Sequence, residues 1–264
     1  MGKLFRQIFK EDIKKVITWM LSPLLIAILG TLVYKLTAFS PVALVIILSG
    51  SVMTFAPLIS LASLNDSDNN RFYGKKAAFY TSLPLKSSEI TGARLINYLI
   101  MGLVIGIFSI FDFLFIGLTS DNDLNSIDIL KYLSQIIDLN IFISLVKFMI
   151  IFALIYIVFA LIIMAANTLG ASRPFNKMGR SAKLVLFVAL ILFQGYVYAK
   201  LISGLGNTSL IKFKEYSTNA GTFSINMLDL NWSSFAIIVL ILGIFALAYF
   251  ALVNYFHKEK ISVE

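Results

Sequence analysis

The chain has 264 residues, of which 59% are hydrophobic, and its mean hydropathy is +0.88. This composition excludes most classes of soluble protein. The net charge is +8, but the basic residues stand at the ends of apolar segments rather than in one soluble patch, so we expect no nucleic-acid partner. Cysteine is absent, which excludes disulfides, thiolate metal sites and a cysteine nucleophile.

Six long apolar segments dominate the sequence. A helix needs about 20 mostly apolar residues to cross the hydrocarbon core of a bilayer, where only hydrogen bonds within the segment can pair its backbone. The segments that reach this length lie at about 16–36, 41–61, 95–118, 141–165, 184–202 and 235–256. We therefore predict an all-α polytopic membrane protein with six transmembrane helices, forming a single transmembrane domain over residues 1–264.

Lys and Arg fall almost entirely in alternate loops. They are concentrated before the first segment, between the second and third, between the fourth and fifth, and after the sixth. The intervening loops carry few basic residues and several Asp and Glu. The positive-inside rule therefore predicts that both termini are cytoplasmic.

Residues 1–15 have an amphipathic pattern. Their apolar side chains recur at helical spacing among basic ones, at Leu4, Phe5, Ile8, Phe9 and Ile13. This pattern predicts a helix that lies in the inner membrane interface before the chain turns into the bilayer. A simple positively charged orientation anchor is the alternative.

Residues 65–94 form the most informative predicted cytoplasmic loop. An Asn/Asp-rich start leads to Gly74 and then to a short helical stretch over 75–83; Pro84 interrupts it, and residues 87–89 resemble a helix start. A short exposed helix bearing aromatic residues between two spans is typical of a docking element for a soluble partner. A plain connector with interfacial aromatics is the alternative. The candidate docking residues are Lys75, Lys76, Phe79, Tyr80, Leu83, Pro84 and Glu89.

Two segments are predicted to lie on the outer side. Apolar residues recur every three or four positions over 124–138, which indicates a short helix that either rests on the outer surface or caps the bundle. Residues Gly204–Trp232 are rich in Gly, Ser, Thr and Asn, and we expect them to be irregular.

Two charged residues lie within predicted spans, Asp112 in the third and Lys147 in the fourth. Charges inside a membrane are costly and are candidates for function. Counting along the two helices places both at a similar depth below the outer surface, so we predict an ion pair. Separate snorkelling of each charge and a role in a substrate or coupling path are the alternatives.

Polar residues also form stripes on two spans. Ser51 and Thr54, with Pro57, give the second span a polar and bendable stripe, and Gln194 and Tyr198 do the same for the fifth. Ordinary helix–helix packing is the alternative interpretation of each stripe.

The residue supply argues against an enzyme. The one histidine, His257, follows the last span, so neither an H-E-x-x-H zinc site nor an intramembrane Ser/His pair can form, and we expect no metal site. The G-x-x-x-x-G-K-[ST] phosphate loop is absent, so the chain has no motif for ATP binding of its own.

The stretch from Leu83 to Ile90, followed by Gly92 and Arg94, resembles the Leu-Pro-x-(Ser/Thr)-(Arg/Lys)-x-Glu-(Ile/Leu)…Gly-(Lys/Arg) stretch of type-2 ABC transporter permeases. In that family this stretch lies between the second and third of six spans, as it does here. The amphipathic start, the six spans and the long outer segment before the sixth span are similar as well. Bacterial half-size permeases of drug, bacteriocin and peptide-toxin exporters look most alike.

The resemblance implies the membrane subunit of an ATP-driven exporter of a hydrophobic or amphipathic compound in a cell membrane, most consistent with a bacterial cytoplasmic membrane. It implies a separate dimer of ABC ATPase subunits, which would hold the ATP and magnesium, and a second permease copy or a related chain beside membrane lipid. The loop at 65–94 would be the coupling loop that docks on the ATPase. The stripes on the second and fifth spans would line the translocation path.

Two other functions remain open. An ion-coupled secondary transporter would need an ionisable relay near the bilayer midplane, for which Asp112 and Lys147 are the candidates. A non-transporting membrane immunity or scaffold protein would need neither an ATPase nor an ion gradient.

Overall fold

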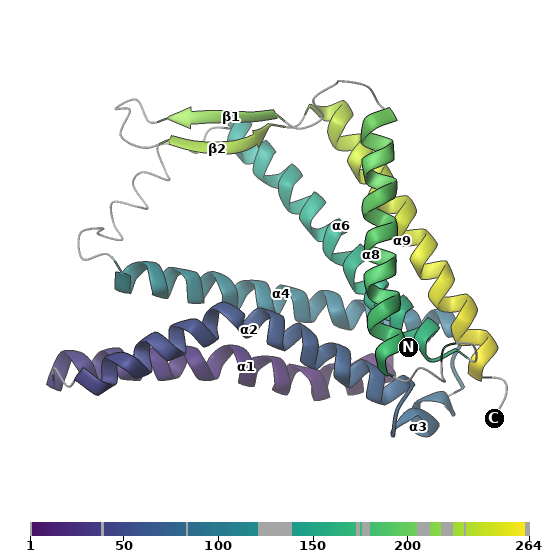
Figure 1. The fold of residues 1–264 in the computed structure, drawn as a ribbon, viewed down its shortest axis with the longest axis horizontal. Helices are drawn as coiled ribbons and strands as arrows, with labels where there is room; N and C mark the ends of the chain where they lie inside the picture. The colour runs from purple at the N-terminus through teal and green to yellow at the C-terminus, as the bar shows by residue number, and fades with distance from the viewer. Residues whose placement is uncertain are drawn as a thin grey trace. The chain divides into compact units, whose positions relative to one another are not determined.

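The computed structural model describes residues 2–37, 40–82, 84–120, 139–172, 175, 180–204, 212–217, 224–229 and 231–261. It divides into two compact units, Met1–Asn122 and Asp123–Glu264 (Figure 1). Unit 1 contains α1 (Gly2–Thr37), α2 (Ser40–Phe72), α3 (Ala77–Thr81) and α4 (Ser87–Ser120). Unit 2 contains α6 (Leu139–Gly170), α8 (Arg180–Gly204), β1 (Lys212–Ser217), β2 (Ser224–Asp229) and α9 (Trp232–Ile261).

Within the described residues, six helices are long and apolar enough to cross a membrane, and they coincide with the six predicted spans. The prediction of a helical multi-pass membrane protein is confirmed to this extent. Each helix extends beyond the predicted apolar segment at one or both ends. The reason is that polar residues can continue a helix outside the hydrocarbon core, where hydropathy no longer marks its boundary.

The first helix differs from the prediction. Residues 2–37 form one uninterrupted helix, with no turn between the amphipathic start and the span. Its buried residues include Leu4, Ile8, Asp12, Val16 and Met20, which recur every four positions along a single face. This buried face continues from the charged first turns of α1 into its apolar part because α2 and α4 pack along α1.

The second helix also runs further than expected. The Asn/Asp-rich residues 65–72, predicted as the start of a loop, form the last two turns of α2. The connection to α4 is therefore shorter than predicted, and it contains the short helix α3. Pro84 lies between α3 and α4, and α4 begins at Ser87, as the sequence indicated.

Unit 2 is built on α6, which packs against both α9 and α8. The rings of Phe159 on α6 and Phe187 on α8 meet edge to face, with centroids 5.8 Å apart. Tyr198 on α8 and Phe245 on α9 make a similar contact at 5.1 Å. Edge-to-face aromatic pairs of this kind add to the packing of helices that share an apolar environment.

The segment Gly204–Trp232 is not wholly irregular, contrary to the prediction. Residues 212–217 and 224–229 pair as an antiparallel two-stranded hairpin, with Lys212 opposite Asp229 and Ser217 opposite Ser224. β2 also contacts α6. The hairpin is the one exception to helix among the secondary-structure elements that the structure describes, and its backbone hydrogen bonds come from cross-strand pairing, which composition does not reveal. The predicted outer helix over 124–138 lies outside the described residues.

Replacing Gly170 with alanine is expected to destabilise the contact between α6 and α8. A Cβ atom at this position would lie 2.5 Å from Cγ and 3.1 Å from Cα of Lys183, so the backbone of α8 would have to shift. We expect a loss of about 1–3 kcal/mol, the usual cost of overpacking. Thermal unfolding of the purified chain in detergent measures this loss. Gly195→Ala in α8 is the matched control, because its added Cβ meets nothing within 4 Å; equal unfolding temperatures for the two variants would contradict the prediction.

Candidate partner-docking site

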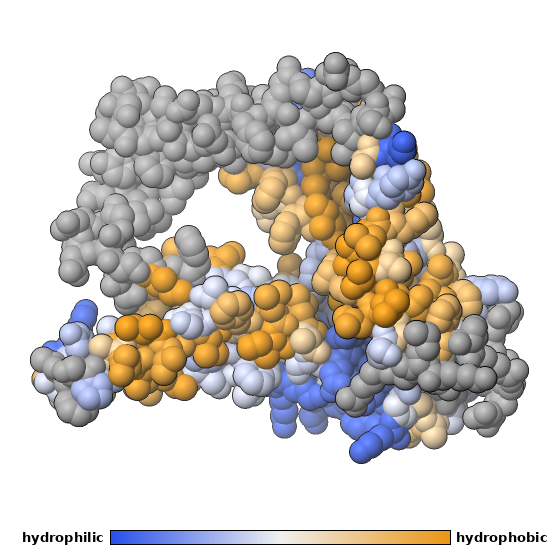
Figure 2. All heavy atoms as spheres, in the orientation of Figure 1, coloured by the Kyte–Doolittle hydropathy of each residue, from blue (hydrophilic) through white to orange (hydrophobic). Residues whose placement is uncertain are grey.

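The short helix α3 lies at the end of unit 1 where α1 begins, α2 ends and α4 begins (Figure 1). We call this region the polar end of unit 1. Hydrophilic residues gather there, whereas apolar residues dominate the visible faces of the long helices (Figure 2). The chain turns back sharply after α2 at Gly74, where a Cβ atom would lie 2.9 Å from Cα of Asn70. The turn is closed by the amide of Lys76, which donates to the carbonyl of Asn70 at 3.1 Å.

An apolar cluster fixes α3 to the three long helices. Tyr80 is 1% exposed and packs with buried residues of α1, α2 and α4, namely Leu4, Ile8, Phe72, Ile90 and Ala93. Its ring lies 5.4 Å from that of Phe72, and its hydroxyl donates to Glu11 at 3.5 Å. Burial, followed by the negative charge of Glu11, raises the pKa of the Tyr80 hydroxyl. Tyr80 therefore attaches α3 to α1, α2 and α4 through its buried side chain.

The opposite side of α3 is open. Phe79 is 54% exposed and meets Tyr80 edge to face, with ring centroids 5.2 Å apart. Lys75 is exposed, and the exposed ammonium of Lys76 lies 3.3 Å from Glu11. A partner approaching α3 would meet an aromatic ring and two cations that precede it by three and four residues in the chain. These are three of the seven predicted docking residues.

The other predicted docking residues have different surroundings. Pro84 is exposed in the connection to α4. Glu89 accepts the backbone N–H of Lys86 at 3.0 Å, which caps the N-terminus of α4. Leu83 lies outside the described residues. The assignment of all seven to a docking site stays a prediction, but burial leaves Tyr80 little surface to offer a partner.

Two buried ion pairs hold the polar end together. Asp12 on α1 accepts two hydrogen bonds from the guanidinium of Arg71 on α2, one of them 2.9 Å long. Arg71 also donates from Nε to Glu11 at 3.2 Å. Asn97 on α4 donates to Asp12 at 2.7 Å, so this one carboxylate joins three helices.

The second pair lies one turn away on α2. Arg94 on α4 donates to both carboxylate oxygens of Asp68, at 2.9 and 2.5 Å. Its third donor reaches the hydroxyl of Tyr73 at 3.2 Å, and its guanidinium lies 4.7 Å from the ring centre of Phe72. Both partners are almost completely buried. A planar guanidinium suits this site, because it can bind a carboxylate with two donors while it stacks on a ring.

These buried residues were not predicted as a group from the sequence. The available signal was Asp12, an acid that follows Leu4 and Ile8 at four-residue spacing on the apolar face of α1. An acid in such a position implies a buried cationic partner. Nothing in the sequence indicated that the partner would be Arg71, because the two residues meet only through the packing of α1 on α2.

The two intramembrane charges lie in different units. Asp112 is buried in α4, and neither of its carboxylate oxygens has a hydrogen-bond partner among the described residues. Lys147 is buried in α6, with its ammonium 4.1 Å from the ring centre of Trp232 on α9. A ring face is a favourable neighbour for a desolvated cation. The predicted ion pair between Asp112 and Lys147 joins two units that are not placed relative to each other, so it stays a prediction.

The predicted path residues also fall in two units. Ser51 and Thr54 are exposed on α2, and their hydroxyls donate to carbonyls one turn back, at 3.0 and 3.1 Å. Pro57 follows them in the same helix. In unit 2, Gln194 donates to the hydroxyl of Tyr198 at 2.7 Å. Whether both stripes face one path stays a prediction.

Comparison of the chain with protein-family models, with curated proteins and with solved structures found no match. No family is thereby shown. In the part of the chain that the structure describes, no three His, Cys, Asp or Glu side chains gather into a possible metal site. The polar end is held by buried ion pairs and by aromatic packing.

Breaking the buried pair should be more damaging than removing it. We expect Arg94→Gln to lower the free energy of unfolding by about 3–5 kcal/mol, because it leaves the Asp68 carboxylate buried without its cation. The double variant Asp68→Asn with Arg94→Gln should lose less than Arg94→Gln alone. Denaturation in detergent measures both values.

The exposed pair between Lys76 and Glu11 serves as the control. Lys76→Gln should cost less than about 1 kcal/mol, because water screens that interaction. If Arg94→Gln and Lys76→Gln were equally mild, the pair between Asp68 and Arg94 would not support the fold in the way described.

Proposed function

We propose that this chain is the membrane-spanning permease subunit of an ATP-driven ABC exporter for a hydrophobic or amphipathic compound. In this proposal the polar end of unit 1 faces the cytoplasm, in agreement with the positive-inside rule, and the protein resides in a bacterial cytoplasmic membrane. The energy comes from a separate ATPase dimer, which holds ATP and magnesium, since the chain has no phosphate loop. A second copy of this chain or a related permease completes the transport unit.

The observation that carries the proposal is the exposed Phe79 on a short helix between two spans. An aromatic residue in water costs free energy unless a partner covers it, and aromatic residues are enriched in the hot spots of protein interfaces. Lys75 and Lys76 precede Phe79 by four and three residues, so a partner that combines an apolar groove with acidic residues would fit. The resemblance of residues 83–94 to the type-2 permease stretch supports an ATPase as that partner.

The packing of α3 on the long helices supports a mechanical role for the proposed contact with the ATPase. Tyr80, on the inner side of the helix, packs against α1, α2 and α4 at once. Asp12 joins the same three helices by hydrogen bonds. A displacement of α3 by a partner would therefore act on three spans through the apolar cluster, and those spans are held to one another by buried charges that are costly to separate. This is the property that a coupling element between ATP hydrolysis and helix tilting needs.

Association with the ATPase is the direct test. The tagged full chain is purified from its native membranes, bound proteins are identified and ATP hydrolysis is assayed. We expect a stoichiometric soluble partner bearing a phosphate loop, and association at least about 30-fold weaker for Phe79→Asp, the effect of losing an aromatic hot spot of about 2 kcal/mol.

Two control variants separate docking from folding. Gln7→Asp introduces the same charge at an exposed position of α1 that is not one of the candidate docking residues, and it should bind the partner normally. Tyr80→Asp should lower the amount of folded protein instead, because Tyr80 is buried. Recovery of the chain without an ATPase, together with transport that does not depend on ATP, would overturn the proposal.

Ion-coupled transport is the second candidate function, and Asp112 favours it. Its carboxylate is buried within a span, with no hydrogen-bond partner for either oxygen in the described residues. A carboxyl group in such a place can take up and release a proton during transport. Transport that requires a proton gradient and is abolished in Asp112→Asn, while ATP depletion has no effect, would support this function over the first.

A further inference from the structure

We propose that unit 1 binds an anionic phospholipid, with one acyl chain in a groove between α1 and α2 and the phosphate at Lys14 and Lys15. The inference rests on the shape of the groove, its apolar lining and the two lysines at its polar end. It does not depend on which transport mechanism the protein uses.

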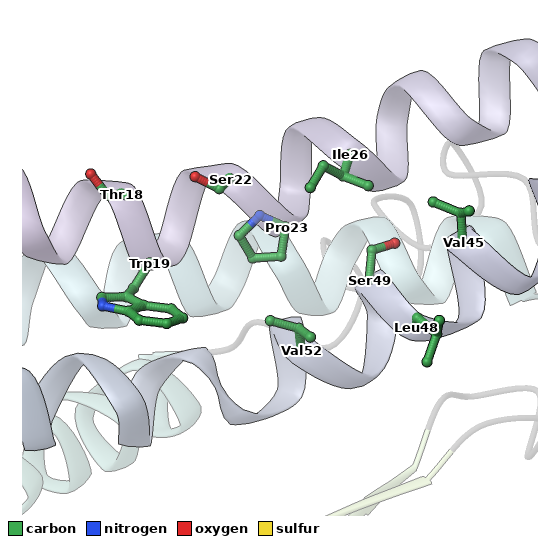
Figure 3. A pocket seen from close by; sticks show the side chains of 9 residues that line it. All are labelled: Thr18, Trp19, Ser22, Pro23, Ile26, Val45, Leu48, Ser49 and Val52. Carbon is green, nitrogen blue, oxygen red and sulfur yellow. The ribbon is translucent and has the colours of Figure 1, made fainter.

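The groove lies between two antiparallel helices in the apolar part of unit 1. It has a volume of about 380 Å³, which is within the range of small-molecule sites. Trp19, Pro23 and Val52 lie in the space between the ribbons of α1 and α2 (Figure 3). The remaining lining residues are Thr18, Ser22, Ile26, Val45, Leu48 and Ser49.

The hydroxyl groups in the lining do not make the groove polar. Thr18 donates to the carbonyl of Lys14 at 2.7 Å, and Ser49 donates to the carbonyl of Ile46 at 2.8 Å. These two hydroxyls donate within their own helices, and the surface left for a ligand is almost entirely carbon. A hydrocarbon chain matches such a surface, whereas a polar compound would lose its hydrogen bonds with water on entering.

The length and direction of the groove suit an acyl chain. On α1 it runs from Thr18 to Ile26, which is about 12 Å at 1.5 Å per residue. The hydrocarbon core of a bilayer is about 30 Å thick, so this length approaches the depth of one leaflet. The groove begins near the polar end of unit 1, where lipid head groups would lie.

Two exposed lysines stand where the head group would be. Lys14 lies one helical turn before Thr18, and Lys15 lies one turn before Trp19. The ammonium of Lys15 also donates to the hydroxyl of Ser67 on α2, which lies about four helical turns from Val52, beyond the polar end of the groove. The neighbouring acids Glu11 and Asp12 are engaged by Arg71. The two lysines are therefore available to a phosphate.

Fluorescence quenching by brominated lipids tests the site, because Trp19 lines it. The chain has two tryptophans, so Trp232→Phe leaves Trp19 as the sole reporter and Trp19→Phe leaves Trp232. Both full-length variants are placed in vesicles of brominated phosphatidylglycerol or brominated phosphatidylcholine. For Trp19 we expect an apparent preference of about fivefold or more for the anionic lipid, the effect of about one lysine at a membrane surface. Trp232 should show no such preference.

Variants at the two ends of the site sharpen the test. Lys14→Gln should reduce the preference severalfold, whereas Lys10→Gln, one turn further from the groove, should leave it unchanged. Val52→Phe fills the groove and should weaken quenching of Trp19 by either lipid. Leu58→Phe places the same ring at an exposed position of α2 outside the lining and should not weaken quenching.

Three results would overturn the proposal. Equal quenching of Trp19 by both lipids would indicate ordinary bilayer contact without a head-group site. A preference that survives Lys14→Gln unchanged would remove the lysine from the site. Trp19 that is not quenched by either lipid would indicate that a protein segment, from this chain or a second copy, covers the groove.

Discussion

The arrangement of unit 1 depends on two carboxylates that are buried against arginines. Asp12 and Asp68 are nearly inaccessible to water, and each receives two hydrogen bonds from one guanidinium. A buried pair of this kind contributes little net stability compared with apolar packing, but separating its partners is very costly. Such pairs therefore fix which surfaces meet. Here they determine how α1, α2 and α4 align at the end of the molecule where the chain leaves the apolar region.

This alignment gives the short helix α3 a rigid base. Five residues of helix would not be stable alone, because nucleation is unfavourable and few hydrogen bonds follow. Tyr80 supplies the missing free energy by packing into the apolar cluster of the polar end. The same orientation leaves Phe79 in solvent. The two neighbouring residues of α3 thus differ in role: Tyr80 packs against unit 1, and Phe79 is open to a partner in the proposed function.

The packing that supports the proposed docking surface and the proposed lipid site both involve the helix α1. Its first three turns hold the ion pairs and the apolar cluster, and its next turns form one wall of the groove that begins at Thr18. Lys14 and Lys15 lie at the transition between the two regions. Because α1 is continuous, a lipid phosphate held at these lysines would bear on the same helix that Asp12 ties to α2 and α4.

The six spans, the start of α4 after Pro84 and the short helix after Gly74 could all be predicted from the sequence. These features depend on local composition and on the length of apolar segments, which need no knowledge of neighbours. Three features could not be predicted and emerged from the packing of the helices: Asp12 meets Arg71, residues 65–72 extend α2, and Tyr80 is buried while Phe79 is exposed. Each of these outcomes depends on contacts between residues far apart in the chain. A hydropathy scale classes Asp12 and Arg71 as hydrophilic and predicts that they are exposed. The packing of α1, α2 and α4 instead removes both side chains from water, and two buried charges of opposite sign must then pair.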